Sequence, residues 1–121
     1  MNKPTVNYKK LIVWQKAMSV AQLTYENTEH FPKKEIYGLV SQMRRASISI
    51  PSNIAEGSKR RSEKEYKHFL FIAYGSGAEL ETQIELSKKL GMIKESKKLE
   101  EMLNEVMKML NTMTREHETK I

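Results

Sequence analysis

Hydrophobic side chains recur every three or four positions along four successive segments of the chain. This spacing gathers side chains on one face of an α-helix. The pattern predicts helices over residues 8–29, 33–57, 63–90 and 96–117. Because the links between these segments are short and polar, the sequence predicts an all-α fold, an up-and-down antiparallel four-helix bundle formed by a single domain over residues 1–121.

Each predicted helix has an apolar stripe that we expect to face the core of the bundle. The expected inward residues, in chain order, are Leu11, Trp14, Met18, Ala21 and Tyr25; Ile36, Val40, Met43, Ser47, Ile50 and Ile54; Tyr66, Phe69, Ala73, Leu80 and Ile84; and Leu99, Leu103, Val106, Leu110 and Met113.

Local signals mark the ends of the helices. Pro32 suits a first helical turn, where its missing N–H has no partner to lose. Ser62 and Glu65 have the spacing of a capping box, and Gly91 can end the third helix in a left-handed conformation. Pro51 lies inside the second predicted helix and removes a backbone N–H, so we expect that helix to be kinked or broken near Pro51.

Two predicted helices have a second apolar face opposite the expected core stripe. Its members are Ile12, Val13, Val20 and Leu23 in the first helix and Phe71, Tyr74 and Ala78 in the third. A small monomeric bundle needs one stripe per helix, and a second one left in water would be an aggregation risk or a binding site. We therefore predict self-association.

The composition excludes several classes of protein. The chain has 121 residues and no cysteine, which excludes disulfides, thiol nucleophiles and cysteine-based zinc sites. Its longest unbroken apolar run, residues 69–74, is far shorter than the roughly 20 residues needed to span a bilayer. The N-terminal segment also lacks the apolar stretch of a signal peptide. We expect a cytoplasmic protein without a membrane partner.

The net charge of +6 is unevenly distributed along the chain. Residues 1–67 contain 13 basic and 6 acidic residues, whereas residues 68–121 contain 8 and 9. The best candidates for phosphate contacts with structured RNA or DNA are Arg44, Lys59, Arg60, Arg61, Lys64 and Lys67. Because no aromatic residue lies between Lys59 and Lys64, the local sequence does not predict base stacking. The alternative is a surface that only keeps the protein in solution.

Polar residues form a row on the second helix that can face a row on the third. The first row contains Arg45, Ser49, Ser52 and Glu56, and the second contains Ser76, Glu79 and Gln83. An arginine and two carboxylates in facing rows would form an oriented ion-pair network that sets the register of helices or subunits. The alternative is a pair of solvated helix faces.

Catalytic and metal sites have weak support in the sequence. Glu65 and His68 match a Glu-x-x-His unit of di-iron bundles, but the second copy that such a site requires is absent from the chain. Gly75-Ser-Gly77 resembles a phosphate loop only in composition, and close helix packing explains it better. We therefore predict no catalytic residue, no metal site and no cofactor.

One enzymatic alternative stays open. Arg61 and His68 have a spacing that resembles the Arg-x(4–6)-His motif of the HEPN superfamily of helical ribonucleases. In that case His68 would act as general acid or base and Arg61 would stabilise the phosphate charge.

The chain resembles the 23S rRNA intervening-sequence proteins, a four-helix bundle family. The shared residues are Leu11-Ile-Val-Trp-Gln-Lys-Ala17, Tyr37-Gly-Leu-Val-Ser-Gln-Met-Arg-Arg-Ala46, Ser49-Ile-Pro-Ser-Asn-Ile-Ala-Glu-Gly57, Gly75-Ser76 and Glu79-Leu80. The resemblance implies an up-and-down bundle that assembles as a homopentamer, often encoded by reading frames inserted in bacterial 23S rRNA genes. The chain is also similar to the accessory variability proteins of diversity-generating retroelements, which are basic pentamers that bind nucleic acid and a reverse transcriptase.

These observations predict a non-catalytic homo-oligomer that binds structured RNA or DNA, with a scaffold for a protein partner as the alternative. The residues expected to have a structural or interface role are Arg45, Ser49, Pro51, Asn53, Glu56, Gly57, Phe71, Tyr74, Ser76 and Glu79.

Overall fold

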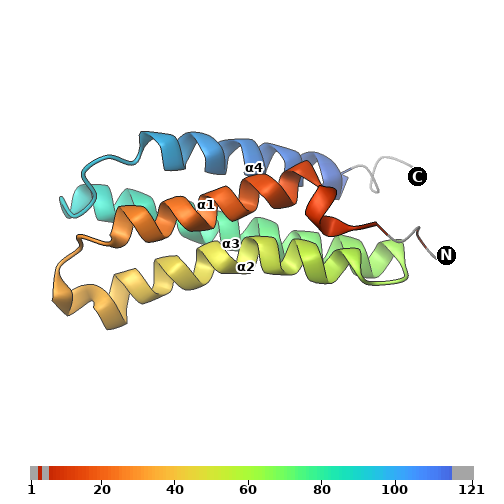
Figure 1. Ribbon diagram of the computed structural model, residues 1–121, viewed down its shortest axis with the longest axis horizontal. Coiled ribbons are helices and arrows are strands. Elements are labelled where there is room, and N and C mark those ends of the chain that lie inside the picture. The colour runs from red at the N-terminus through yellow and green to blue at the C-terminus, as the bar shows by residue number, and fades with distance from the viewer. Residues whose placement is uncertain (1–2, 4–5, 116–121) are drawn as a thin grey trace.

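The computed structural model describes Lys3 and residues 6–115. Its long elements are the helices α1 (Ile12–Thr28), α2 (Ser41–Ser58), α3 (Glu63–Lys89) and α4 (Lys97–Arg115). They lie side by side and are joined by short connections at the two ends of the bundle (Figure 1). Each helix packs against its neighbours in the sequence, and α1 also packs against α4, which closes the bundle. The predicted all-α four-helix bundle is confirmed.

Two helices begin later than predicted. A 3-10 turn at Tyr8–Lys10 precedes α1, and the extended residue Leu11 separates the two. Before α2 the chain forms a 3-10 turn at Lys33–Glu35 and a π-helical turn at Ile36–Val40. Backbone angles inside that π-helical turn are not helical at Gly38, where φ is −113° and ψ is −110°. The apolar periodicity continued through Gly38 and therefore did not reveal this interruption.

Pro51 lies in the interior of α2 and is buried. The chain remains helical on both sides of it, so α2 is not broken at Pro51. The non-helical backbone of this part of the sequence lies instead at Gly38, which precedes α2.

The cap signals predict the ends of α3 correctly. The Ser62 hydroxyl accepts a hydrogen bond of 3.1 Å from the backbone N–H of Glu65, as an N-cap residue does. Gly91 follows α3 with a φ of +69°, a conformation that glycine adopts without steric cost. The fourth helix reaches Arg115, and the predicted last turn at residues 116–117 lies outside the described residues.

The expected core face of α1 is wrong. Its buried residues are Val13, Ala17, Val20, Thr24 and Thr28, whereas Met18 and Tyr25 are exposed. The two threonines are compatible with burial because each hydroxyl donates to the carbonyl oxygen four residues earlier, at 2.8 Å in both cases.

The core faces of the other helices are largely as predicted. The expected core residues that are buried are Val40 in the π-helical turn; Met43, Ser47, Ile50 and Ile54 in α2; Ala73, Leu80 and Ile84 in α3; and Leu99, Leu103, Val106 and Leu110 in α4. Ile36 is exposed because it precedes the interruption at Gly38.

Apolar side chains, of which Met18 and Ile48 are exposed, form a face on α1 and α2, and further exposed apolar side chains lie on α3. Trp14, Met18 and Ala21 of α1 line a groove with Ile48 and Pro51 of α2. The exposed group on α3 includes Phe71, Ile72 and Leu86. Tyr74, which was expected at an interface, is half-buried and packs against the core.

Candidate nucleic-acid interface

The connection between α2 and α3 lies at the same end of the bundle as the first turn of the chain (Figure 1). The backbone N–H of Lys3 donates a hydrogen bond of 2.7 Å to the carbonyl oxygen of Arg61. The Lys3 ammonium also donates to the carbonyl oxygen of Ser58, at 2.6 Å. The fold therefore adds Lys3 to the cluster of cations that the sequence places between Lys59 and Lys67.

Aromatic rings accompany the cations at this end, which we call the basic end and define by Lys3, Lys59, Arg60, Arg61, Lys64 and Lys67. The described residues form four cation–ring pairs there: Lys3 with Tyr66 at 4.8 Å from the ring centroid, Lys59 with Tyr8 at 5.7 Å, Arg60 with Phe69 at 4.7 Å, and Lys67 with Phe71 at 5.6 Å. These distances are typical of cation–π contacts. The prediction of no base stacking concerned only residues 59–64, which contain no aromatic residue. Tyr66, Phe69 and Phe71 follow on α3, and folding adds Tyr8 from the N-terminal segment.

Arg60 is held from two directions. Its guanidinium lies over the Phe69 ring, and its Nη2 is 3.2 Å from Glu56 Oε2. About 42% of the Arg60 side chain is nevertheless exposed. Glu56 thus pairs along its own helix with Arg60 rather than across to α3. Arg61 and Lys64 are exposed beside this pair.

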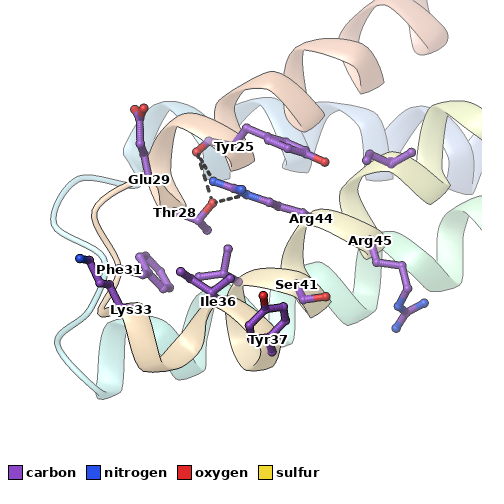
Figure 2. A pocket seen from close by; sticks show the side chains of 12 residues that line it. Tyr25, Thr28, Glu29, Phe31, Lys33, Ile36, Tyr37, Ser41, Arg44 and Arg45 are labelled. Atoms are coloured by element: carbon purple, nitrogen blue, oxygen red, sulfur yellow. Dashed lines mark hydrogen bonds between the residues drawn. The ribbon is translucent and has the colours of Figure 1, made fainter.

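Arg44 does not join the basic end. It is separated from Lys59 by 15 positions of α2, which at 1.5 Å per residue is about 22 Å. Its Nε donates to the Thr28 hydroxyl at 3.0 Å, its Nη2 donates to the Tyr25 carbonyl oxygen at 3.4 Å, and its guanidinium lies 4.4 Å from the Tyr25 ring centroid (Figure 2). Arg44 therefore ties α2 to α1.

A cleft of about 790 Å³ lies beside Arg44, between the end of α1 and the start of α2 (Figure 2). Apolar side chains such as Phe31, Ile36 and Ile48 line it, together with Arg44 and Arg45. No sequence motif indicated this cleft, because it depends on the path of the chain through the π-helical turn.

The polar rows that helical spacing places on α2 and α3 are in contact. The hydroxyls of Ser49 and Ser76 are 2.8 Å apart, and the Asn53 amide donates to the Ser49 carbonyl oxygen at 2.8 Å. Arg45 Nη2 is 3.1 Å from Glu79 Oε2. The Ser49–Ser76 and Arg45–Glu79 contacts join α2 to α3, whereas the hydrogen bond from Asn53 to Ser49 lies within α2.

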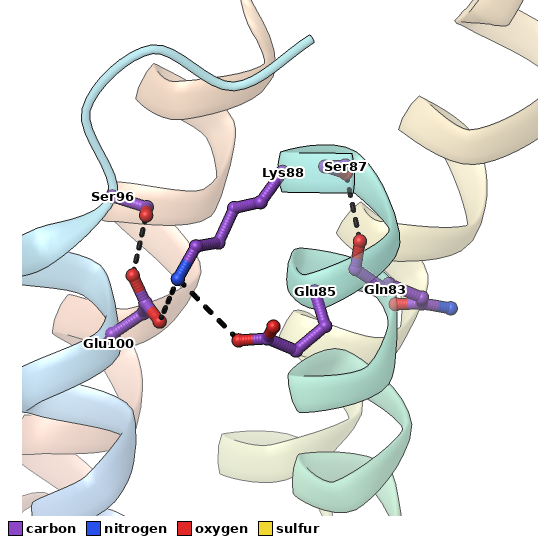
Figure 3. A network of polar contacts seen from close by, with 6 residues as sticks. All are labelled: Gln83, Glu85, Ser87, Lys88, Ser96 and Glu100. Atoms are coloured by element: carbon purple, nitrogen blue, oxygen red, sulfur yellow. Dashed lines mark hydrogen bonds and ion pairs between the residues drawn. The ribbon is translucent and has the colours of Figure 1, made fainter. Parts of the chain in front are cut away.

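Gln83, the last residue of the polar row on α3, differs from Ser76 and Glu79 because its side-chain oxygen has no partner on the described helix α2. Its Oε1 is buried without a hydrogen-bond partner among the described residues. Its backbone carbonyl oxygen accepts a hydrogen bond from the Ser87 hydroxyl at 2.8 Å (Figure 3).

A second polar network joins α3 to α4 and was not expected from the sequence. Lys88 lies between Glu85, at 3.6 Å, and Glu100, at 3.2 Å, while the Ser96 hydroxyl donates to Glu100 at 2.5 Å (Figure 3). The hydrogen bond from Ser96 lowers the pKa of Glu100, with a further contribution from Lys88, although partial burial opposes the shift. The pKa of Lys88 is raised, chiefly by its hydrogen bond to Glu100.

The candidate ribonuclease pair is exposed. His68 makes an edge-to-face contact with Phe69 at 5.3 Å between ring centroids, and the backbone carbonyl of Arg61 accepts from Lys3. Within residues 6–115 and Lys3, no group of three or more histidine and acidic side chains is arranged to hold a metal ion. None of the helices in this part of the chain is both long and apolar enough to cross a bilayer.

The fold and this site define an antiparallel helical bundle with a cationic end. Residues 9–112 match the family model described as 23S rRNA-intervening sequence protein, and the chain belongs to this family. This is not a known enzyme family. A comparison with curated proteins gave no match.

Proposed function

We propose that this protein is a non-catalytic homo-oligomer whose basic end binds structured RNA or DNA through phosphate contacts. The observation that carries the proposal is the convergence of Lys3, from the N-terminal segment, with Lys59, Arg60 and Arg61 at the end of α2. Lys64, in the first turn of α3, adds a further cation. Neutralising phosphates releases condensed counterions, which drives binding without base recognition.

Glutamates in the same region do not cancel the basic end. Glu56 pairs with Arg60, and Glu65 accepts a hydrogen bond from the Ser62 hydroxyl, so both carboxylates also position neighbouring groups. The six cations of the basic end outnumber the three acidic residues of the region, Glu56, Glu63 and Glu65, and this excess of positive charge would attract a polyanion over several ångströms.

Self-association would multiply this site. The exposed apolar residues of α1 and α2, including Met18 and Ile48, support an interface between copies. Five copies, as the resemblance implies, would carry a formal charge of about +30 and would present several weak cationic patches to one nucleic acid, which raises affinity through avidity. We place this assembly in the cytoplasm.

The test is binding of structured RNA by the purified full-length protein in gel-shift experiments at about 50 mM salt. We expect a salt-dependent shift, which changing Lys59, Arg60 and Arg61 together to Ala should weaken at least about tenfold. Native mass measurement and the 260/280 nm absorbance ratio of untreated protein should show a homo-oligomer with co-purified nucleic acid. A protein that does not bind at low salt, or a triple variant that binds as well as the original, would contradict the proposal.

A second candidate function is a scaffold for a protein partner. The cleft beside Arg44 favours it, since Ile36 and Ile48 are exposed there next to two arginines. In that case the Ile36→Glu variant would lose the partner protein while its nucleic-acid affinity and its assembly would stay the same, because Ile36 lines the cleft and is not among the residues of the groove between α1 and α2.

A further inference from the structure

We infer that the basic end binds unpaired nucleotides in preference to duplex, and that the Arg60 guanidinium is the platform on which a base stacks. This inference rests on the proposed function, because it names the class of nucleic acid that the same surface takes. Unpaired nucleotides occur in single strands and in the loops of structured RNA.

The first support is the orientation of Arg60. Its guanidinium carbon lies 4.7 Å from the Phe69 ring centroid, and its Nη2 is 3.2 Å from Glu56 Oε2. The side chain is still 42% exposed, so part of it remains open to solvent. Guanidinium planes and aromatic rings are the groups on which proteins stack splayed-out bases. Because Glu56 and Phe69 already hold the guanidinium, little side-chain entropy is lost on binding.

The second support is what surrounds this platform. Lys59 lies over Tyr8, and Lys3 lies over Tyr66, so the basic end has two further cation–ring pairs, both on half-buried rings. Alternation of cations, which contact phosphates, with planar groups, which stack on bases, is characteristic of single-strand binding. A duplex keeps its bases stacked inside and would meet only the charges.

A simpler explanation is that the cations cover aromatic rings and contact only phosphates. The two explanations differ in whether the planar shape of the side chain at position 60 contributes to the affinity for single strands. Replacing Arg60 by Lys keeps the charge but removes the planar group, so only a stacking role predicts a selective loss.

The experiment uses the full-length protein with a fluorescent oligouridine strand and a blunt RNA duplex of the same length. We expect the original protein to bind the single strand more tightly. Arg60→Lys should weaken single-strand binding about fivefold or more, since stacking of one base contributes at least this much, and should change duplex binding less than about twofold. Arg61→Lys is the matched control, because Arg61 is a neighbouring exposed cation that has no cation–π contact within the described part of the chain. We expect it to change neither affinity more than about twofold.

A second readout follows stacking directly. The experiment uses a single strand that carries the fluorescent base aminopurine, at saturating protein. The original protein and the Arg61→Lys variant should quench the aminopurine fluorescence, and the Arg60→Lys variant should quench it less. Tighter or equal binding of the duplex by the original protein, or equal losses for the two arginine variants, would overturn the inference and leave phosphate binding intact. Failure to bind either oligonucleotide would overturn the proposed function as well.

Discussion

Gly57 lies where the last turn of α2 meets the first turns of α3. A Cβ at this position would be 2.9 Å from Phe69 Cβ and 3.2 Å from the backbone oxygen of Tyr66. Neither atom belongs to the flexible end of a side chain, so the helices themselves would have to separate. We expect Gly57→Ala to lower the free energy of unfolding by about 1–3 kcal/mol, measured by urea denaturation.

Gly75 offers a control within the same protein. A Cβ there would have no neighbour within 4 Å, and the residue lies inside α3. We expect Gly75→Ala to raise the free energy of unfolding by about 0.5–1 kcal/mol at the same protein concentration, because alanine favours helix more than glycine does. If Gly57→Ala stabilised the protein to the same extent as Gly75→Ala, the close approach of α2 and α3 at Gly57 would be refuted.

The lowered pKa of Glu100 predicts a pH dependence of stability. Because the folded-state pKa lies below the ordinary value of 4.5, the charged form stabilises the fold above that value, and this contribution is lost as the pH falls through the folded-state pKa. Glu100→Gln should therefore reduce the free energy of unfolding at pH about 6 and have little effect at pH about 2. Ser96→Ala should raise the Glu100 pKa in an NMR titration, since the Ser96 hydroxyl makes the largest contribution. An unchanged pKa in that variant would contradict this assignment.

At the scale of the helices, α1 shows why a hydrophobic pattern can indicate the wrong face. Its large apolar residues, including Trp14 and Met18, form the groove with α2, whereas the small residues Ala17 and Thr24 face the core. Small side chains let neighbouring helices approach closely, and a threonine hydroxyl bonded to its own helix can be buried. A prediction based only on hydrophobicity therefore assigns the face with the larger apolar side chains to the core.

The contact between Arg45 and Glu79 joins α2 to α3 on the surface of the subunit. Their side chains are 60% and 43% exposed, so water screens the pair. A double-mutant cycle with Arg45→Met and Glu79→Gln should give a coupling of less than about 1 kcal/mol in the free energy of unfolding. A much larger coupling would contradict the exposed environment and would indicate that assembly buries the pair.

For the whole molecule, the basic end predicts how binding depends on salt. Each phosphate contact contributes about 0.7–0.9 to the magnitude of the slope of log affinity against log salt concentration. Lys64→Ala should therefore reduce the magnitude of that slope for RNA by about this amount, as measured by fluorescence anisotropy. Lys108→Ala is the control, because Lys108 is exposed on α4, and it should leave the slope unchanged.

The exposed face of α1 and α2 predicts how copies associate. Ile48 is 43% exposed within one subunit, so a charge there should be tolerated by the fold but not by an interface. Ile48→Glu should shift the sedimenting species toward the 14.1 kDa monomer at micromolar concentration. Thr112→Glu adds the same charge to an exposed position of α4 and should leave the assembly unchanged. Sedimentation of the original protein as a monomer would remove the basis for self-association.

The sequence by itself determined the number and order of the helices, the caps at Ser62 and Gly91, and the core faces of α2 and α4. These features depend on hydrophobic periodicity and on cap residues that lie within a few positions of one another, so they can be predicted from short stretches of the sequence. The resemblance carried by the same residues also identified the family correctly.

Only the tertiary structure decided which face of α1 is buried and which side chains surround the cations. Lys3 contacts Tyr66, and Tyr8 contacts Lys59, although more than 50 positions of the chain separate the members of each pair. Arg44, which was predicted to act with these cations, instead donates a hydrogen bond to Thr28 of α1. Such contacts depend on how the helices pack against one another, and helix packing cannot be predicted from the spacing of residues along the chain. The basic end was therefore recognisable from the sequence as a set of charges, and only the fold showed which ring each cation contacts.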